Sequence, residues 1–230
     1  SEFTGDWTIG AGDDLMYANQ TIVLDGNLSI SDLGMLTLRN VTLALKGGEF
    51  DPQEITVFDG TLVISDWDDD PETHGDKSTI RADDPDFNYY FQIYEGATFS
   101  LSNSLVRDCG RLFNLLGINA GLYIASEDAM VRDSEISNGY GGIFIDGVDA
   151  DVENCIISDN TWIGLYVDNG ASPVVVGCTI EDNLREGVMV KGQSNLFVGD
   201  SNIRGNLRGV VVDGAFMAAY ECAISANEEV

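Results

Sequence analysis

The sequence predicts an all-β fold, a single-stranded right-handed parallel β-helix in which about eight or nine short coils stack into a solenoid. Three observations predict it: a repeat of roughly 22 residues, strand-like alternation within each repeat, and 26 glycines against only four prolines. A repeat this short leaves no room for helical crossovers, so we expect consecutive coils to pair directly, about 4.8 Å apart. The hydrophobic content of 44% supplies a core, and residues 1–230 are expected to form one domain.

The repeat is clearest in the C-terminal half, where a glycine begins a short hydrophobic segment in four copies. In each copy alternate side chains face opposite sides, which is the periodicity of a strand and not of a helix. Between the copies, a cysteine or serine is followed two positions later by isoleucine and five positions later by asparagine. The copies are Gly142-Ile143-Phe144-Ile145, Gly164-Leu165-Tyr166-Val167, Gly187-Val188-Met189-Val190 and Gly209-Val210-Val211-Val212, at steps of 22, 23 and 22 residues, and the asparagines are Asn160, Asn183, Asn206 and Asn227.

The earlier copies are less regular. The segment 121–124 continues the repeat, and equivalent strands are expected at 36–40, 62–66 and 99–103, at steps of 26 and 37 residues. These uneven steps predict loop insertions at 66–90 and 108–120. Residues 1–3 resemble a cloning scar, and because solenoids need capping segments, the chain is expected to be cut from a longer protein.

Coils that stack in register place equivalent residues in columns along the rod. We expect the asparagines to bend the chain inside a turn and to hydrogen-bond amide to amide along their column. Cys155 and Cys178 share a column with Cys222, but stacked side chains point in parallel, so we expect free, buried thiols and no disulfide. Two columns are predicted to point inward: Ile145, Val167, Val190 and Val212, and Val131, Val152, Val175, Val198 and Ala219.

In these motifs the sequence resembles the parallel β-helix repeat family, which includes pectate-lyase-like and other carbohydrate-active or carbohydrate-binding proteins. The resemblance covers the chain from about Ile22 onward and is strongest after Gly121. It implies the fold and a possible carbohydrate ligand. The calcium-site aspartates and the catalytic arginine of pectate lyases have no assignable counterparts in this chain, so the resemblance does not fix a function.

Charge and composition narrow the class of partner. The chain has 39 acidic and 11 basic residues, a formal net charge of -28, which disfavours nucleic acid and anionic membrane surfaces. No apolar segment approaches the roughly 18 residues of a membrane span, so membrane insertion is not expected. Sequons at Asn19, Asn27 and Asn40 favour an extracellular or cell-surface location.

An outward-facing stripe is the main candidate for ligand binding. Aromatic rings beside arginines can stack on sugars and hydrogen-bond their hydroxyl or carboxylate groups. Alternatively, a neighbouring loop or domain covers the stripe, or a second copy of the chain buries it in a dimer, so that the partner is a protein surface. The candidate residues are Tyr140, Phe144, Trp162, Tyr166, Arg185 and Arg208.

The ends of the same strands place Asp146, Asp168 and Asp213 in one column with Lys191. Carboxylates one coil apart would lie near the separation of about 5 Å found in retaining glycosidases. Solvated aspartates also favour the turns that end such strands. We therefore expect a non-catalytic module with no catalytic residues; the alternative is a polysaccharide lyase or glycoside hydrolase that uses these three aspartates.

The segment 66–86 is rich in carboxylates and is the candidate metal site. Calcium takes six to eight oxygen ligands, which such a loop can supply, and a solvated acidic loop is the alternative. We select Asp66, Asp68, Asp70 and Glu72 as the calcium ligands, and no other cofactor is expected. The single histidine, His74, lies in the same segment and is expected to be a surface residue.

Overall fold

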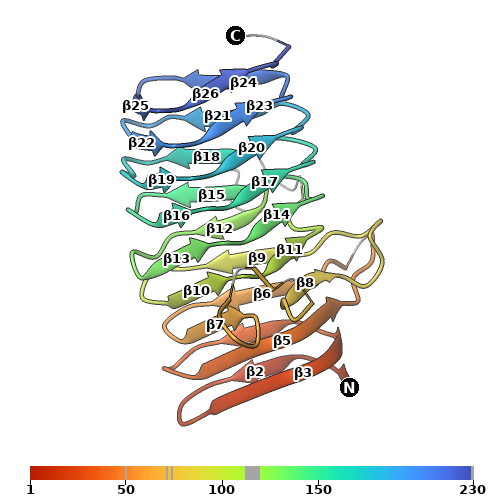
Figure 1. The fold of residues 1–230 in the computed structure, drawn as a ribbon. Coiled ribbons are helices and arrows are strands. Elements are labelled where there is room, and N and C mark those ends of the chain that lie inside the picture. The colour runs from red at the N-terminus through yellow and green to blue at the C-terminus, as the bar shows by residue number, and fades with distance from the viewer. Residues whose placement is uncertain (50, 71, 74, 112–119, 229–230) are drawn as a thin grey trace.

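The computed structural model describes residues 1–49, 51–70, 72–73, 75–111 and 120–228. These residues form 26 strands, which stack as a rod from the N-terminus at one end to the C-terminus at the other (Figure 1). Each coil pairs in parallel with the next, and nine coils follow one another in the part of the chain that is described. The parallel β-helix of eight or nine coils is therefore confirmed. No helix long and apolar enough to cross a membrane occurs among the described residues.

Each coil contributes one strand to a nine-stranded parallel sheet, and in the last five coils the glycine repeat stands at the start of this strand. The register joins equivalent positions of successive copies, as in Tyr166 opposite Phe144 and Met189 opposite Tyr166. The strands are β2 (Trp7–Ile9), β4 (Leu28–Ile30), β6 (Glu54–Val57), β9 (Tyr90–Ile93), β12 (Leu122–Ile124), β15 (Ile143–Asp146), β18 (Leu165–Asp168), β21 (Glu186–Val190) and β24 (Arg208–Val212).

The remaining two faces of the rod belong to one 17-stranded sheet that bends along its length. The first strand of each coil's pair lies on one face: β7 (Thr61–Ser65), β10 (Thr98–Ser102), β13 (Ala129–Arg132), β16 (Asp151–Glu153), β19 (Val174–Val176), β22 (Asn195–Gly199) and β25 (Phe216–Tyr220). The other face holds β1 (Glu2–Thr4), β8 (Thr79–Ala82), β11 (Leu105–Arg107), β14 (Glu135–Ser137), β17 (Ile156–Ser158), β20 (Thr179–Glu181), β23 (Asn202–Arg204) and β26 (Ala223–Ser225). Two long strands, β3 (Asp14–Asp25) and β5 (Met35–Leu45), run across both faces.

The bend between these two faces is made by single residues in the left-handed region. Asn19 and Asn40 have φ of 52° and 50°, and Asn103, Asp133 and Asn154 repeat the conformation in later coils. Asparagine and aspartate tolerate positive φ better than other non-glycine residues, because their short polar side chains bond to nearby backbone. The Asn and Asp residues that follow the strands therefore set the corners of the coil.

Inward side chains from all three faces form one continuous core. Ile145, Val167 and Val190 are buried, and so are Val131, Val152, Val175 and Val198, which confirms both inward columns over most of their length. Val212 and Ala219 keep the register, opposite Val190 and Val198, but both are exposed. Both columns thus continue into the ninth coil, where these side chains are exposed because that coil has a described neighbour on one side only.

The asparagine ladder is confirmed. The amide Nδ2 of Asn160 donates to Oδ1 of Asn183 at 2.9 Å, Asn183 donates to Asn206 at 3.0 Å, and Asn206 donates to Asn227 at 3.1 Å. The asparagines do not bend the chain themselves. The preceding residue does so, with φ of 56° at Asp159. The expected free thiols are also found: Cys155 and Cys178 are buried, and Cys222 is partly exposed.

The first predicted insertion differs from expectation, and most of the second is not described. The segment 66–90 includes β8, whose Ile80 points into the core, so the added loops flank a regular strand of the third coil. Of the second insertion, residues 112–119 lie outside the described residues, as does His74.

Candidate functional site

One column of outward side chains changes character along the rod. On the outer face of the nine-stranded sheet, the first four coils place Thr8, Ser29, Thr56 and Gln92 in register. The next three coils replace these polar residues with Tyr123, Phe144 and Tyr166. The strands are otherwise equivalent, so the aromatic residues are not required to build the coil.

These rings join others from the adjoining turns into an aromatic surface. Phe144 stacks on Tyr166 with ring centroids 4.7 Å apart, and Trp162 stacks on Phe144 at 5.7 Å. Trp162 also contacts Tyr140 at 5.5 Å. Earlier in the rod, Phe58 stacks on Tyr94 at 4.8 Å and Tyr94 contacts Tyr123 at 6.0 Å. The aromatic surface consists of Phe58, Tyr94, Tyr123, Tyr140, Phe144, Trp162 and Tyr166.

The rings differ in what they can offer a ligand. Tyr140, Trp162 and Tyr166 are half-buried and present part of each ring to solvent. Phe144 is only 3% exposed, because Trp162 and Tyr166 stack against it, so it supports the surface from beneath. Tyr123 is similarly buried. Of the aromatic residues predicted from the sequence, Phe144 thus lacks the exposure expected of a contact residue.

The predicted arginines continue the column that begins at Tyr140 and Trp162. The N–H of Arg185 donates to the carbonyl of Trp162, and the N–H of Arg208 donates to that of Arg185, both at 3.1 Å. Glu186, which is buried, forms ion pairs with both arginines. The Arg185 side chain stays half exposed at the edge of the aromatic surface, whereas the guanidinium of Arg208 is held by Glu186.

The strand-end aspartates are held by hydrogen bonds. Asp146 lies opposite Asp168 in register, and its Oδ2 accepts the hydroxyl of Tyr123 at 2.5 Å. Oδ2 of Asp168 accepts the hydroxyl of Tyr166 at 2.7 Å. Burial, together with the bonded carboxylate, raises the pKa of both tyrosines. Asp213 lies further along the rod, and its Oδ2 is 3.7 Å from Nζ of Lys191.

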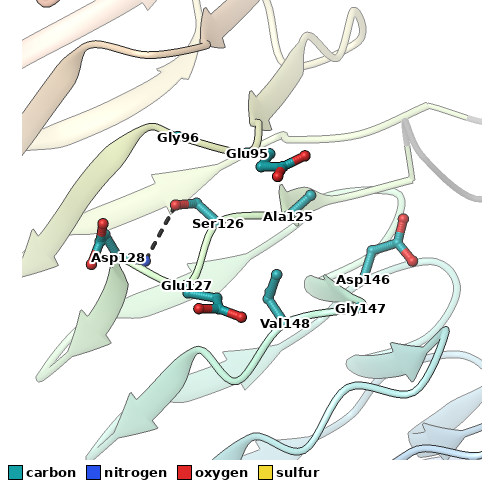
Figure 2. Close-up of a pocket in the computed structure, with 9 residues that line it drawn as sticks. All are labelled: Glu95, Gly96, Ala125, Ser126, Glu127, Asp128, Asp146, Gly147 and Val148. Atoms are coloured by element: carbon teal, nitrogen blue, oxygen red, sulfur yellow. Dashed lines mark hydrogen bonds between the residues drawn. The ribbon is translucent and has the colours of Figure 1, made fainter.

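An acid-lined hollow of about 580 Å³ adjoins this edge of the aromatic surface. It is formed at three successive turns after β9, β12 and β15, and Asp146, which accepts the Tyr123 hydroxyl, is one of its lining residues (Figure 2). Four of its lining residues are acidic: Glu95, Glu127, Asp128 and Asp146. Such a hollow favours cations or neutral hydroxyl groups over anions.

The predicted calcium ligands are only partly brought together. Asp66 and Asp68 lie close to Asp76, whereas Asp70 and Glu72 are not part of this group. Oδ1 of Asp70 accepts the N–H of Glu72 at 3.0 Å, which closes a turn in the loop. Burial raises the pKa of Asp66, and hydrogen bonds from Asn103 and from the Asp69 N–H oppose this shift.

Several residues of these sites were not found from the sequence. Phe58 and Tyr94 follow β6 and β9 outside the clear part of the repeat, so no column assigned them to the stripe. Glu186 directly follows Arg185, and its burial beneath two arginines has no signal in periodicity. Asp76 was one of many acidic residues in its segment. The residues that line the hollow lie in or beside turns, and the only signal that they share in the sequence is a high content of aspartate and glutamate.

A family model described as a right handed beta helix region matches residues 90–230. Among solved structures, the A-module of the mannuronan C-5 epimerase AlgE4 from Azotobacter vinelandii is 14% identical, with a TM-score of 0.44 over 95% of this chain and 66% of that chain. The periplasmic alginate epimerase AlgG is also 14% identical, with a TM-score of 0.43 over 96% of this chain and 60% of that one. No curated protein matches the sequence.

Proposed function

Because the chain belongs to the right-handed β-helix family, whose model matches residues 90–230, we propose that it is a non-catalytic module that binds a carbohydrate chain along the aromatic surface. The observation that carries the proposal is the stack of half-exposed rings at Tyr140, Trp162 and Tyr166 over the buried Phe144. Rings that are fixed by stacking lose little entropy when a sugar packs on them, and tryptophan and tyrosine commonly dominate binding energy.

The charge of the protein supports a neutral carbohydrate as ligand. The formal net charge is -28, and the acid-lined hollow lies at one edge of the surface. A polyuronic acid would therefore approach a field of its own sign, while hydroxyl groups could donate to Asp168 and accept from Arg185. From Phe58 in the third coil to Tyr166 in the seventh, the surface extends over about 19 Å along the rod, which suits a chain of sugars.

An extracellular or cell-surface location is part of this proposal. Two of the three sequon asparagines, Asn19 and Asn40, stand at the bend of the 17-stranded sheet, where the amide of Asn40 donates to that of Asn19 at 2.8 Å. Both lie at the N-terminal end of the rod, away from the aromatic surface. Attached glycans there would leave the proposed ligand site open.

The proposal is tested by glycan-array screening followed by calorimetry with the best oligosaccharide. Trp162→Ala and Tyr166→Ala are each expected to weaken binding at least tenfold, since each removes a half-exposed ring. Phe197→Ala is the matched control, because it removes an exposed ring from the outer face of β22. Binding that falls equally in all three variants, or a wild type that binds no neutral oligosaccharide, would contradict the proposal.

A dimer that buries the aromatic surface is the main rival. It predicts that wild type sediments as a dimer and that Tyr166→Glu converts it to a monomer, because a charge would be buried in the interface. Carbohydrate binding predicts a monomeric wild type whose sedimentation is the same as that of Tyr166→Glu. Sedimentation velocity on the two proteins separates these outcomes.

A second candidate function is a polysaccharide lyase or glycoside hydrolase. It is favoured by the hydrogen bond between the Tyr123 hydroxyl and Asp146 at the edge of the hollow, since such a pair can exchange a proton with a substrate. Reducing-end and ultraviolet assays on a polysaccharide panel test it. If wild type forms product, and Asp146→Asn abolishes this activity whereas Asp213→Asn does not, the enzyme proposal replaces the binding proposal.

A further inference from the structure

Three carboxylates converge where the chain leaves β7 and enters the loop that leads to β8. Ligand oxygens of Asp66, Asp68 and Asp76 all lie within 4.8 Å of one another. Calcium binds oxygen at about 2.3–2.6 Å, so two oxygens on one ion are at most about 5 Å apart. The spacing of this carboxylate trio therefore fits a single calcium ion.

Two members of the trio hold a buried oxygen that lacks a hydrogen-bond partner. Asp66 is 0% exposed; its Oδ1 accepts the N–H of Asp69 at 3.0 Å, but its Oδ2 has no partner within the described ranges. Oδ1 of Asp76 is likewise buried and unpartnered there. No ion pair among the described residues includes any member of the trio. A buried carboxylate without a counter-charge is costly, and a bound cation removes that cost.

A neutral oxygen ligand is available one coil later. Asp66 follows β7, whose Ile64 lies opposite Leu101, two residues before Asn103. Asn103 is buried, and its Oδ1 has no partner in the part of the chain that is described. Carboxylate and amide oxygens together are the ligands that calcium prefers.

Two other acidic residues of the loop, Asp69 and Asp70, have partners of their own. Asp69 forms an ion pair with Arg39 at 3.2 Å, and Asp70 closes the turn to Glu72. We propose that Asp66, Asp68 and Asp76 bind one calcium ion, with the side-chain oxygen of Asn103 as a fourth ligand. The ion would fasten the loop to the corner between the third and fourth coils.

Calorimetric titration of the full chain with calcium chloride at constant ionic strength tests the proposal. One saturable site is expected, and Asp66→Asn and Asp76→Asn should each weaken it at least tenfold. Asp66→Asn should fold normally, because asparagine has nearly the shape of aspartate and its Oδ1 can still accept the N–H of Asp69. Terbium supplies a second readout, since Trp67 is 51% exposed beside two ligands and can transfer excitation energy to a bound lanthanide.

Asp84→Asn is the matched control. It removes the same charge from an exposed turn after β8, where an asparagine can still accept the N–H of Asp86. This variant should keep the wild-type affinity, the calcium-dependent rise in melting temperature and the terbium signal. The proposal is overturned if wild type shows no saturable binding, or if Asp84→Asn and Asp66→Asn weaken binding equally, which would indicate general screening of an acidic protein.

Discussion

Replacing Asn183 with alanine is the sharpest test of how the coils are held together. Its amide Nδ2 donates to the carbonyl of Ile157 and to Oδ1 of Asn206, at 3.1 and 3.0 Å. Its Oδ1 accepts from the backbone N–H and from the amide of Asn160, at 3.2 and 2.9 Å. One side chain therefore joins three consecutive coils in a region that is buried from water.

The expected cost follows from which groups lose every partner. In Asn183→Ala, Oδ1 of Asn206 still accepts the backbone N–H of residue 183, and the amide of Asn160 keeps the more distant carbonyl of Ile136. The backbone N–H of Asn160 keeps no acceptor in the described structure. One orphaned buried donor costs about 1–3 kcal/mol, and we expect the free energy of unfolding to fall by that amount.

Urea unfolding followed by circular dichroism measures this loss of stability. Native-state hydrogen exchange should show faster exchange at the backbone N–H of Asn160. Asn227→Ala is the matched control: it removes the same kind of side chain at the partly exposed end of the ladder, where water can replace it. Its cost should be below about 1 kcal/mol. Equal effects of the two substitutions, or no effect of Asn183→Ala, would refute the reasoning.

Two further predictions concern the core and a corner of the coil. Val175→Asp should lower the free energy of unfolding by more than about 4 kcal/mol, because it buries an unpaired charge. The adjacent Val174→Asp, at a site that is 39% exposed, should have little effect. Denaturant titration of both variants checks which side chains of β19 point inward. Burial raises the pKa of Asp108 above its ordinary 3.8, so the native state binds this proton more tightly than the unfolded chain does. Asp108 therefore supports the fold at acidic pH and opposes it as pH rises past that value, so Asp108→Asn should stabilise the protein at pH 7 and leave it unchanged near pH 3. The backbone tolerates the change, since φ is 60° at Asp108 and 58° at Asn138, an asparagine in the next coil. Thermal melts of wild type and Asp108→Asn at pH 7 and pH 3 measure the effect. The same difference in melting temperature between the two proteins at both pH values would exclude this account.

The repeat allowed the core and the register to be predicted because they follow from two periods alone. Alternation within the strand sets which side chains point inward, and the 22-residue step sets which of them meet. Val152, Val175 and Val198 obey both rules and lie in one buried column. The ladder of Asn183 followed in the same way, because a polar residue that recurs in the core must bond to its own copies.

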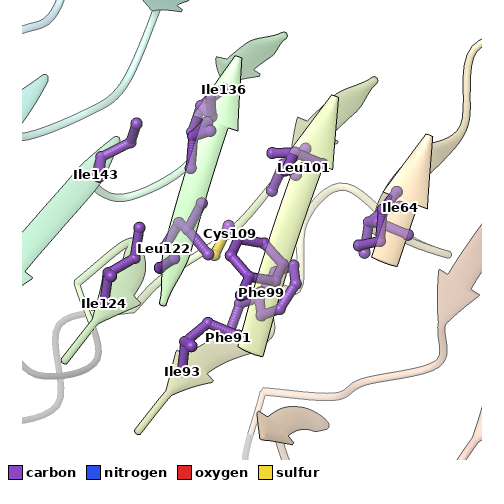
Figure 3. Packing of buried hydrophobic residues seen from close by; sticks show 14 of the residues in the cluster. Ile64, Phe91, Ile93, Phe99, Leu101, Cys109, Leu122, Ile124, Ile136 and Ile143 are labelled. Carbon is purple, nitrogen blue, oxygen red and sulfur yellow. The ribbon is translucent and has the colours of Figure 1, made fainter. Parts of the chain in front are cut away.

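Packing that depends on ring size or on loop conformation could not be predicted. In the fourth coil, Phe91 and Phe99 fill the interior edge to face, with ring centroids 5.6 Å apart, where the two neighbouring coils use aliphatic residues (Figure 3). The alternation of its strand makes Phe144 an outward-facing residue, but the ring of the turn residue Trp162 stacks on it and helps to bury it. Asp76 reaches Asp66 only through the path of a non-repeating loop, which no periodicity specifies.

The outer face of the nine-stranded sheet is where the sequence is freest to serve a function. An inward residue must fit neighbours in the coils on both sides, and a corner residue must accept a positive φ, so both are constrained by the fold. The outward column has neither constraint: Thr56 and Tyr166 occupy equivalent positions on strands of the same geometry. A change from threonine, serine and glutamine to stacked aromatic rings along this column therefore has no cause in the coil itself. The proposed contact with a carbohydrate, or the rival contact with a second copy of the chain, would account for apolar rings on the surface of a protein of net charge -28.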